Sequence, residues 1–169
     1  MAALLMRKIP APVRRIALAA LVVAGLAPAL AGCDMFGTSG GGELSPGLTA
    51  SMSSPGASLD RATALDLINQ YRGTVGASAL TDDPSLDAQA QSLAATYAKN
   101  DKAPTAPSGI VGLRASAGYA NFAETFSGWR NSPADAAVLA SAQGTRAGIA
   151  TVYDPNSTYG VYWILVLGA

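Results

Sequence analysis

Two helix starts follow one another in the stretch Asn121-Phe-Ala-Glu-Thr-Phe-Ser-Gly-Trp-Arg-Asn-Ser-Pro-Ala-Asp-Ala-Ala-Val-Leu139. Asn121 can cap the first helix, and Glu124, three residues on, can complete a capping box. Ser132 and Pro133 suit the cap and the first position of the second helix, with Asp135 in its first turn. Aromatic side chains recur at spacings of four and three on one face of the first helix, and we expect them in the core: Phe122, Phe126 and Trp129.

The last part of the chain predicts a β-hairpin. Residues 148–153 alternate, with Ile149, Thr151 and Tyr153 on one side, and residues 154–158 have turn chemistry. Residues 161–167 are β-branched, aromatic or aliphatic on both faces. That pattern is typical of a central strand covered on both sides. A small sheet with helices on both faces would provide the cover.

Two more helices precede these elements. Ser58 is a candidate cap for a helix that ends near residues 73–76, and Leu80 is a candidate anchor in the following link. Asp83 and Pro84 then suit the start of a second helix. One stripe of this second helix is apolar: Leu86, Ala90, Leu93, Ala94, Tyr97 and Ala98. Residues 100–109 lack regularity, and residues 110–118 favour a strand.

The first 32 residues predict a bacterial signal peptide. Four basic residues precede an uncharged run, 16–30, which is shorter than the roughly 20 residues of a membrane-spanning helix. The run ends Leu30-Ala31-Gly32-Cys33, a lipoprotein signal box. We therefore expect lipidation of Cys33, as by palmitate, and attachment of an exported protein to the membrane on the periplasmic side of the cell envelope.

Residues 33–57 are rich in Gly, Ser, Pro and Thr after the cysteine, and they predict a flexible tether. The folded domain is then expected over residues 58–169. Because Cys33 is the only cysteine, this domain has no internal disulfide, and its stability must come from its core.

Composition excludes several kinds of chemistry. The chain has no histidine, which rules out a serine–histidine triad, histidine metal ligation and an imidazole base. Without the signal peptide, seven basic and eleven acidic residues remain, which argues against a nucleic-acid surface. Asp82 and Asp83 are better explained as a turn and a cap than as a calcium pair. We expect no metal and no other cofactor.

Four motifs in order resemble the CAP superfamily of cysteine-rich secretory, antigen 5 and pathogenesis-related proteins. Residues 65–72 resemble the family's Leu-x-x-Ile-Asn-x-Tyr-Arg helix, and residues 80–86 its link and second helix. Residues 129–133 resemble Trp-x-x-Ser-Pro, and Gly148-Ile149-Ala150 with Tyr162-Trp163 resemble the last two strands. The resemblance covers residues 64–167. It implies an α+β fold, an α-β-α sandwich around a small, mainly antiparallel sheet.

The resemblance also implies a cleft, which in many members is lined by two histidines and two acidic residues and can hold a divalent metal. Asp135 stands where the family has a histidine after Ser-Pro, and Leu113-Arg114 stand where it has Glu-Asn. Residues 100–109 lack the other histidine. No catalytic or metal-binding residue is therefore transferred to this chain.

Three residues are candidates for a remnant of that cleft: Asp135, Arg114 and Glu124. Asp135 is a cleft acid or a helix-start residue that favours the positive end of the dipole. Glu124 is a cleft acid or part of the capping box, and capping is the simpler explanation for both. Arg114 can face Asp135 and replace the metal with an ion pair. A separate hypothesis places an exposed tyrosine patch at Tyr153, Tyr159 and Tyr162, with alternate members buried.

These expectations favour a degenerate CAP-like domain that is not an enzyme and that binds a protein partner or a small hydrophobic ligand, lipid included. One alternative is a hydrolase with Asp135 and Glu124 as an acid/base pair of the kind that cleaves glycosidic bonds. Another is a structural lipoprotein whose domain is a spacer.

Overall fold

A computed structural model describes residues 44–169, so the predicted signal peptide and Cys33 lie outside the described residues. The elements follow one another as α1 (Pro46–Thr49), α2 (Arg61–Thr74), β1 (Thr81–Asp82), α3 (Pro84–Asn100), β2 (Ile110–Ala117), α4 (Phe122–Asn131), α5 (Pro133–Leu139), β3 (Arg146–Tyr153) and β4 (Val161–Gly168). Within these residues no helix is both long and apolar enough to cross a membrane.

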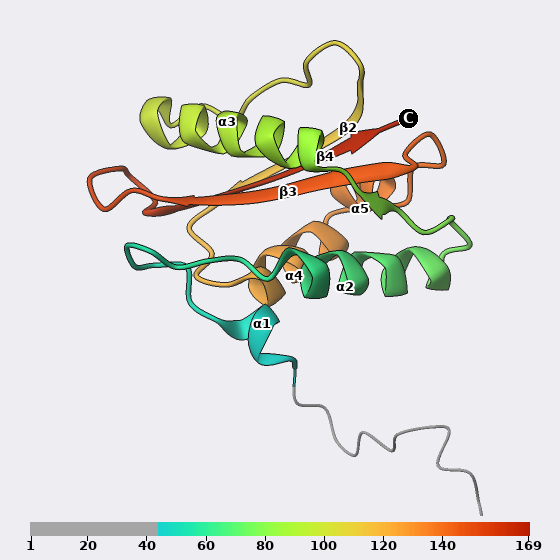
Figure 1. Cartoon of the computed structure of the whole chain (residues 1–169), viewed down its shortest axis with the longest axis horizontal. Helices are drawn as coiled ribbons and strands as arrows, with labels where there is room; N and C mark the ends of the chain where they lie inside the picture. Colours follow the sequence, from blue (N-terminus) through green and yellow to red (C-terminus); the bar gives the residue numbers. More distant parts are fainter. Residues whose placement is uncertain (1–43) are drawn as a thin grey trace, which may run out of the picture. The chain divides into compact units, whose positions relative to one another are not determined.

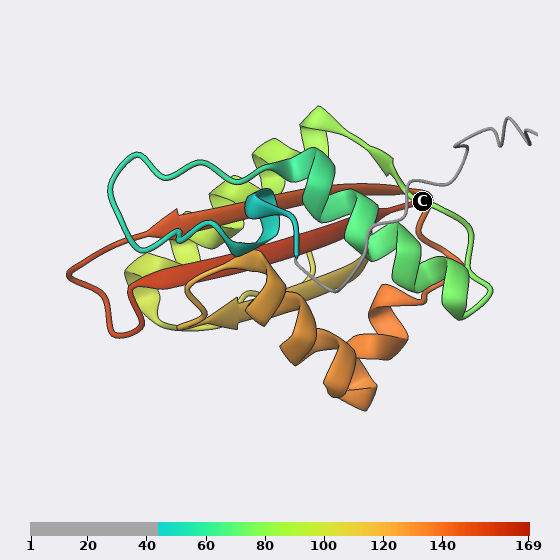
Figure 2. The same ribbon diagram turned by 90° about the horizontal axis from the view of Figure 1, so that it is seen from below.

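The four strands form one sheet in the order β1-β3-β4-β2. β4 pairs antiparallel with β3 and with β2, whereas β1 pairs parallel with the first two residues of β3. Figure 1 shows α3 on one face of this sheet and α2 and α4 on the other. Seen from below in Figure 2, α4 and α5 lie over the β2 side of the sheet and α2 over the β3 side. The predicted α-β-α sandwich with a mainly antiparallel sheet is confirmed.

The central strand β4 is buried along its whole length, as its sequence predicts. Trp163, Leu165 and Leu167 face the core under α2 and α4. Ile164 and Val166 face the smaller core under α3. Each fully buried side chain of this size stabilises the fold by roughly 1.5–3 kcal/mol. The strand therefore requires helices on both faces, and the sequence provides them.

α3 begins and packs as predicted. The Asp83 carboxylate accepts a hydrogen bond from the Ser85 amide at 2.8 Å, and Pro84 occupies the first turn. Ala90, Ala94 and Ala98 are buried against the sheet. The closest approach is at Gly148, where an added Cβ would lie 2.1 Å from the carbonyl carbon of Leu86. Only glycine allows α3 to lie so near β3.

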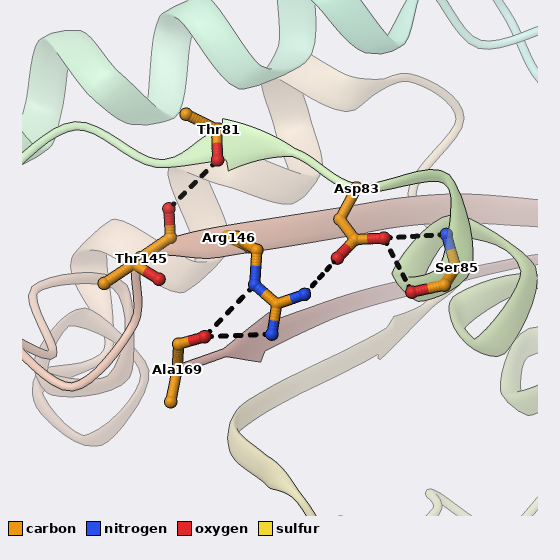
Figure 3. A network of polar contacts seen from close by, with 6 residues as sticks. All are labelled: Thr81, Asp83, Ser85, Thr145, Arg146 and Ala169. Atoms are coloured by element: carbon orange, nitrogen blue, oxygen red, sulfur yellow. Dashed lines mark hydrogen bonds and ion pairs between the residues drawn. The ribbon is translucent and has the colours of Figure 1, made fainter.

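Arg146, at the start of β3, connects the start of α3 with the residue that follows β4 (Figure 3). Its guanidinium pairs with Asp83, the cap of α3, and donates to the backbone oxygen of Ala169 from two nitrogens, at 3.1 and 2.9 Å. Thr81, in β1, donates its amide to the carbonyl of Thr145 at 3.0 Å. The short strand β1 is therefore fixed by the start of β3, although two residues are too few for a strand to be predicted.

Phe122, Phe126 and Trp129 are in the core, as predicted, with exposures of 1%, 4% and 1%. Phe122 lies 6.2 Å from Phe126 and from Trp129, measured between ring centroids. The indole nitrogen of Trp129 donates to the Ser116 hydroxyl at 2.7 Å, which ties α4 to β2.

The packed domain begins before the predicted boundary at Ser58. Leu48, in α1, and Met52 are 6% and 3% exposed and belong to the main core. The Met52 amide donates to the carbonyl of Ala120 at 2.7 Å. The surrounding Gly, Ser and Pro residues suggested a tether, but two large apolar side chains suffice to hold residues 46–52 on the domain. Asp60, and not the predicted Ser58, caps α2.

Replacing Leu48 by alanine tests whether this segment is part of the fold. We expect Leu48→Ala to lower the free energy of unfolding by about 2–5 kcal/mol, because it leaves a cavity in a packed core. Urea denaturation followed by tryptophan fluorescence measures the change. Leu44→Ala, at a half-exposed position, is the matched control and should have little effect. If both variants had the same free energy of unfolding, residues 46–52 would not be part of the packed domain.

Candidate functional site

One face of β2 determines what lies at the position of the predicted cleft. Alternate residues Gly112, Arg114 and Ser116 point toward α4 and α5. A Cβ at Gly112 would lie 2.9 Å from Val138 in α5, so the absence of a side chain lets the end of α5 approach. Ser116 meets Trp129 of α4. Arg114, between them, therefore faces the start of α5.

Arg114 and Asp135 form an ion pair there. Both side chains are about a quarter exposed, at 25% and 28%. Arg114 is the only hydrogen-bond partner assigned to the Asp135 carboxylate within residues 44–169. The side chain of Ser132 makes no capping hydrogen bond, so α5 begins with Pro133 and without a side-chain cap. Asp135 lies in the first turn of α5, as the helix-start explanation predicts, and it also forms the predicted ion pair with Arg114.

Glu124 has a different role. Its carboxylate accepts the Ala120 amide at 3.1 Å, and its own amide donates to the Asn121 side chain at 3.0 Å. This exchange confirms the capping explanation. Glu124 lies on the exposed side of α4, and no hydrogen bond joins it to Arg114 or Asp135. The structure thus brings two of the three candidate residues together.

The residues at this position do not fit a metal ion. In the described part of the chain, no three Cys, Asp or Glu side chains come together in a group that could hold one. The Asp135 carboxylate, the acidic group at this position, is already paired with the Arg114 guanidinium. Asp83 is likewise engaged, with Ser85 and Arg146.

A second feature is a groove along the outer surface of α4, which we call the α2–α4 groove. Its widest part has a volume of about 490 Å³. Two further hollows, of about 200 and 220 Å³, continue it toward α2 and share residues with their neighbours. Its walls are mainly apolar, and its main lining residues are Leu44, Leu67, Tyr71, Tyr119, Ala123 and Phe126.

The α2–α4 groove has exposed apolar side chains at its mouth. Leu44 is 50% exposed and Tyr119 38% exposed. Ser127, Arg130 and Asn131 add polar groups along it. An apolar hollow with a few polar groups is typical of a ligand or partner site. Sequence patterns did not indicate the groove, because it combines Leu44, from the predicted tether, with the partly buried Leu67 of α2.

The tyrosines near the hairpin do not form one exposed patch. Tyr162 is fully buried, and its hydroxyl donates to Asp101, whereas Tyr159 is 53% exposed. Their rings meet edge to face, 6.2 Å apart. Hydrogen bonds from Thr158 and Tyr162 lower the pKa of the Asp101 carboxyl. The expectation that alternate tyrosines are buried is confirmed for Tyr162, and Tyr159 alone among the three is largely exposed.

The polar residues of the first motif, 65–72, are structural. Asn69 makes two hydrogen bonds with the backbone of Leu80, at 2.8 and 2.9 Å. Arg72 is fully buried and donates to the carbonyls of Ser78, Leu139, Ser141 and Gly144, at 2.6–3.2 Å. Both side chains therefore fix the backbone that follows α2 and the loop before β3. Neither forms a hydrogen bond with Arg114 or Asp135.

Comparison with known protein families agrees with the fold. The family model for CAP, the cysteine-rich secretory protein family, matches residues 65–167, and the chain belongs to this family. No significant match is found among curated protein sequences.

Solved structures show the same fold. An outer surface protein from Borrelia burgdorferi has a TM-score of 0.52 at 16% identity, with 64% of this chain and 91% of that chain covered. An extracellular protein containing an SCP domain from Bacillus anthracis has a TM-score of 0.52 at 20% identity, with 64% of this chain and 40% of that chain covered. At such identities the likeness establishes the fold alone.

A double-mutant cycle on Arg114 and Asp135 measures the strength of their ion pair. We expect a coupling free energy of about 1 kcal/mol or less between Arg114→Met and Asp135→Asn, since partly exposed pairs are screened by water. Urea denaturation at low and high salt gives the free energies of unfolding of the wild type, the two single variants and the double variant. A coupling above about 2 kcal/mol that does not fall with salt would contradict a solvent-screened pair.

Proposed function

We propose that the protein is an exported, lipid-anchored envelope protein whose degenerate CAP domain is a binding module and not an enzyme. The anchor is supported by the sequence Leu30-Ala31-Gly32-Cys33 after a basic and apolar leader. Export also agrees with two proteins of the same fold, one an outer surface protein and the other an extracellular protein. We place the domain on the periplasmic side of the membrane, held there by Cys33.

One observation carries the non-enzymatic part of the proposal. The two charged groups at the position of the family's cleft, Arg114 and Asp135, neutralise each other. A chain without histidine also has no imidazole to act as base or metal ligand there. A hydrolase that used Asp135 and Glu124 would need both carboxylates free, but one binds Arg114 and the other the Ala120 amide.

The α2–α4 groove is the surface that we assign to binding. It is mainly apolar, open to solvent and bordered by the exposed side chains of Leu44 and Tyr119. Burying such side chains contributes roughly 25 cal/mol for each Å² of apolar surface removed from water. A small hydrophobic ligand or an apolar segment of a protein partner fits this chemistry. We infer that the module captures one of them close to the membrane.

The anchor is tested by Cys33→Ser. We expect the wild-type protein to fractionate with membranes and to carry acyl chains on Cys33, detected by mass spectrometry of its N-terminal peptide. The variant should lose both properties, because this thiol is the attachment point of the lipid. An unmodified Cys33 in the wild-type protein would contradict the lipoprotein part of the proposal. It would not affect the proposal that the groove binds a ligand or partner.

Binding is tested by native mass spectrometry of the protein purified gently from its own envelope fraction. We expect a non-covalent added mass, or a partner cross-linked at the groove, that Ser127→Arg reduces at least about tenfold by placing a charge among the apolar walls. Ser92→Arg, on the exposed side of α3, is the matched control and should retain wild-type binding. Equal loss or equal retention in both variants would contradict the assignment of the groove.

A further inference from the structure

The outer edge of β3 differs at three successive positions along its length. β1 pairs only with Arg146 and Ala147. At Ile149, two residues further along this edge, side chains replace the strand. The Ile149 amide donates to Asp87 at 2.8 Å, and its carbonyl accepts from the Nε of Arg61 at 3.0 Å. At Ile149, which β1 does not reach, the edge of β3 is thus closed by the ion pair between Arg61 of α2 and Asp87 of α3.

Thr151 is the next residue on the same edge, and no strand or side chain among residues 44–169 is assigned a hydrogen bond to it. Its hydroxyl is buried, yet it has no hydrogen-bond partner among the described residues. Buried hydroxyls are nearly always bonded, so the partner of this one is a water molecule or a ligand that lies outside the protein chain. No other side chain between residues 44 and 169 leaves a buried polar atom in this state.

A pocket of about 250 Å³ lies against Thr151. It runs around the sheet edge, from the segment before α2 to α3, and its wall is mainly polar. The lining residues are Ala57, Ser58, Leu59, Arg61, Gln91 and Thr151. No residue of the α2–α4 groove lines it, so the two hollows are separate.

Arg61 is the one charged residue in this lining, and its donors are only partly used. Nε binds the Ile149 carbonyl and lies 3.5 Å from the Asp87 carboxylate. No acceptor within the described residues is assigned to the two terminal nitrogens, and the side chain is 46% exposed. Asp87 is fixed beside it: burial raises the pKa of this carboxyl, whereas the Ile149 amide and Arg61 act in the opposite direction.

The backbone amides at the start of α2 do not account for the pocket. Asp60 already accepts the Thr63 amide at 3.0 Å and the Thr63 hydroxyl at 2.7 Å. Those two hydrogen bonds lower the pKa of the Asp60 carboxyl. The helix start is therefore capped by the protein itself, and the available donors are the side chains of Arg61, Gln91, Ser58 and Thr151.

We propose that this pocket is a second binding site and that it takes a small carboxylate ligand. The terminal nitrogens of Arg61 match the two oxygens of a carboxylate. Gln91 and Ser58 offer neutral donors and acceptors for polar groups next to the carboxylate. Thr151 supplies a hydroxyl at the sheet edge, whose missing hydrogen bond the ligand completes. The site does not depend on the function assigned to the groove.

The probe is N-acetyl-L-alanine, compared with N-acetyl-L-alaninamide, which has the same size and no carboxylate. Each is titrated into the full chain, labelled with nitrogen-15, in micelles of an uncharged detergent. We expect saturable chemical-shift changes at Arg61, Gln91 and Thr151 with the acid, and affinity at least about tenfold weaker with the amide. No saturation, or equal affinities for both compounds, would overturn the proposal.

Thr151→Val separates binding from folding. We expect this variant to bind the acid more weakly while its urea midpoint stays equal to or above that of the wild type, because no hydrogen bond is lost. Gln91→Ala, at an exposed position, should weaken binding without a change in stability. If Thr151→Val binds the acid as tightly as the wild type, or if its midpoint is clearly lowered, the hydroxyl has no role in binding a ligand.

Discussion

The buried guanidinium of Arg72 binds four backbone carbonyls from separate parts of the fold. It is a charged group without exposure to water, and burial lowers its pKa. Its partners among the described residues are carbonyl oxygens and not a carboxylate. Because an unpaired buried charge is very unfavourable, the backbone must bring those carbonyls to it. Arg72 thereby fixes several segments around one point: the end of α2, the following link, the end of α5 and the loop into β3.

This constraint explains how the chain keeps the fold of its family without the family's cleft residues. The motif residues that are retained serve the architecture: Asn69 and Arg72 hold loops, Trp129 ties α4 to β2, and Gly148 admits α3. The positions that differ, Arg114 and Asp135, form a partly exposed ion pair between β2 and α5. Fold and cleft chemistry are therefore separable in this domain, and the binding roles that we propose lie elsewhere, in the α2–α4 groove and in the pocket beside Thr151.

Much of the fold could be predicted because its strongest signals are local. The apolar run of β4, the Asp83-Pro84 start of α3 and the aromatic spacing of α4 each describe their own surroundings, and the structure confirms them. The start of the domain could not be predicted in this way. Leu48 and Met52 are isolated among Gly, Ser and Pro, and only the core that receives them shows their role.

The site was predictable in part. Arg114 and Asp135 are 21 residues apart in sequence, and only the family resemblance suggested that they face each other, as they do. The pocket beside Thr151 was beyond sequence reasoning, since Arg61, Gln91 and Thr151 come from three elements that meet only at the edge of β3. Asp87 lies off the apolar stripe of its helix, where a solvated side chain is expected, yet it closes that edge.

The most direct test of this account is the free energy of unfolding of Arg72→Met, measured by urea denaturation with the fluorescence of buried Trp129 and Trp163 as the signal. Arg72→Lys, which keeps the charge but not the fork of donors, is measured beside it. If Arg72 fixes the fold, the methionine variant loses at least about 3 kcal/mol, and lysine restores only part of the loss. A methionine variant within about 1 kcal/mol of the wild type would show that the family motif is retained for something other than architecture.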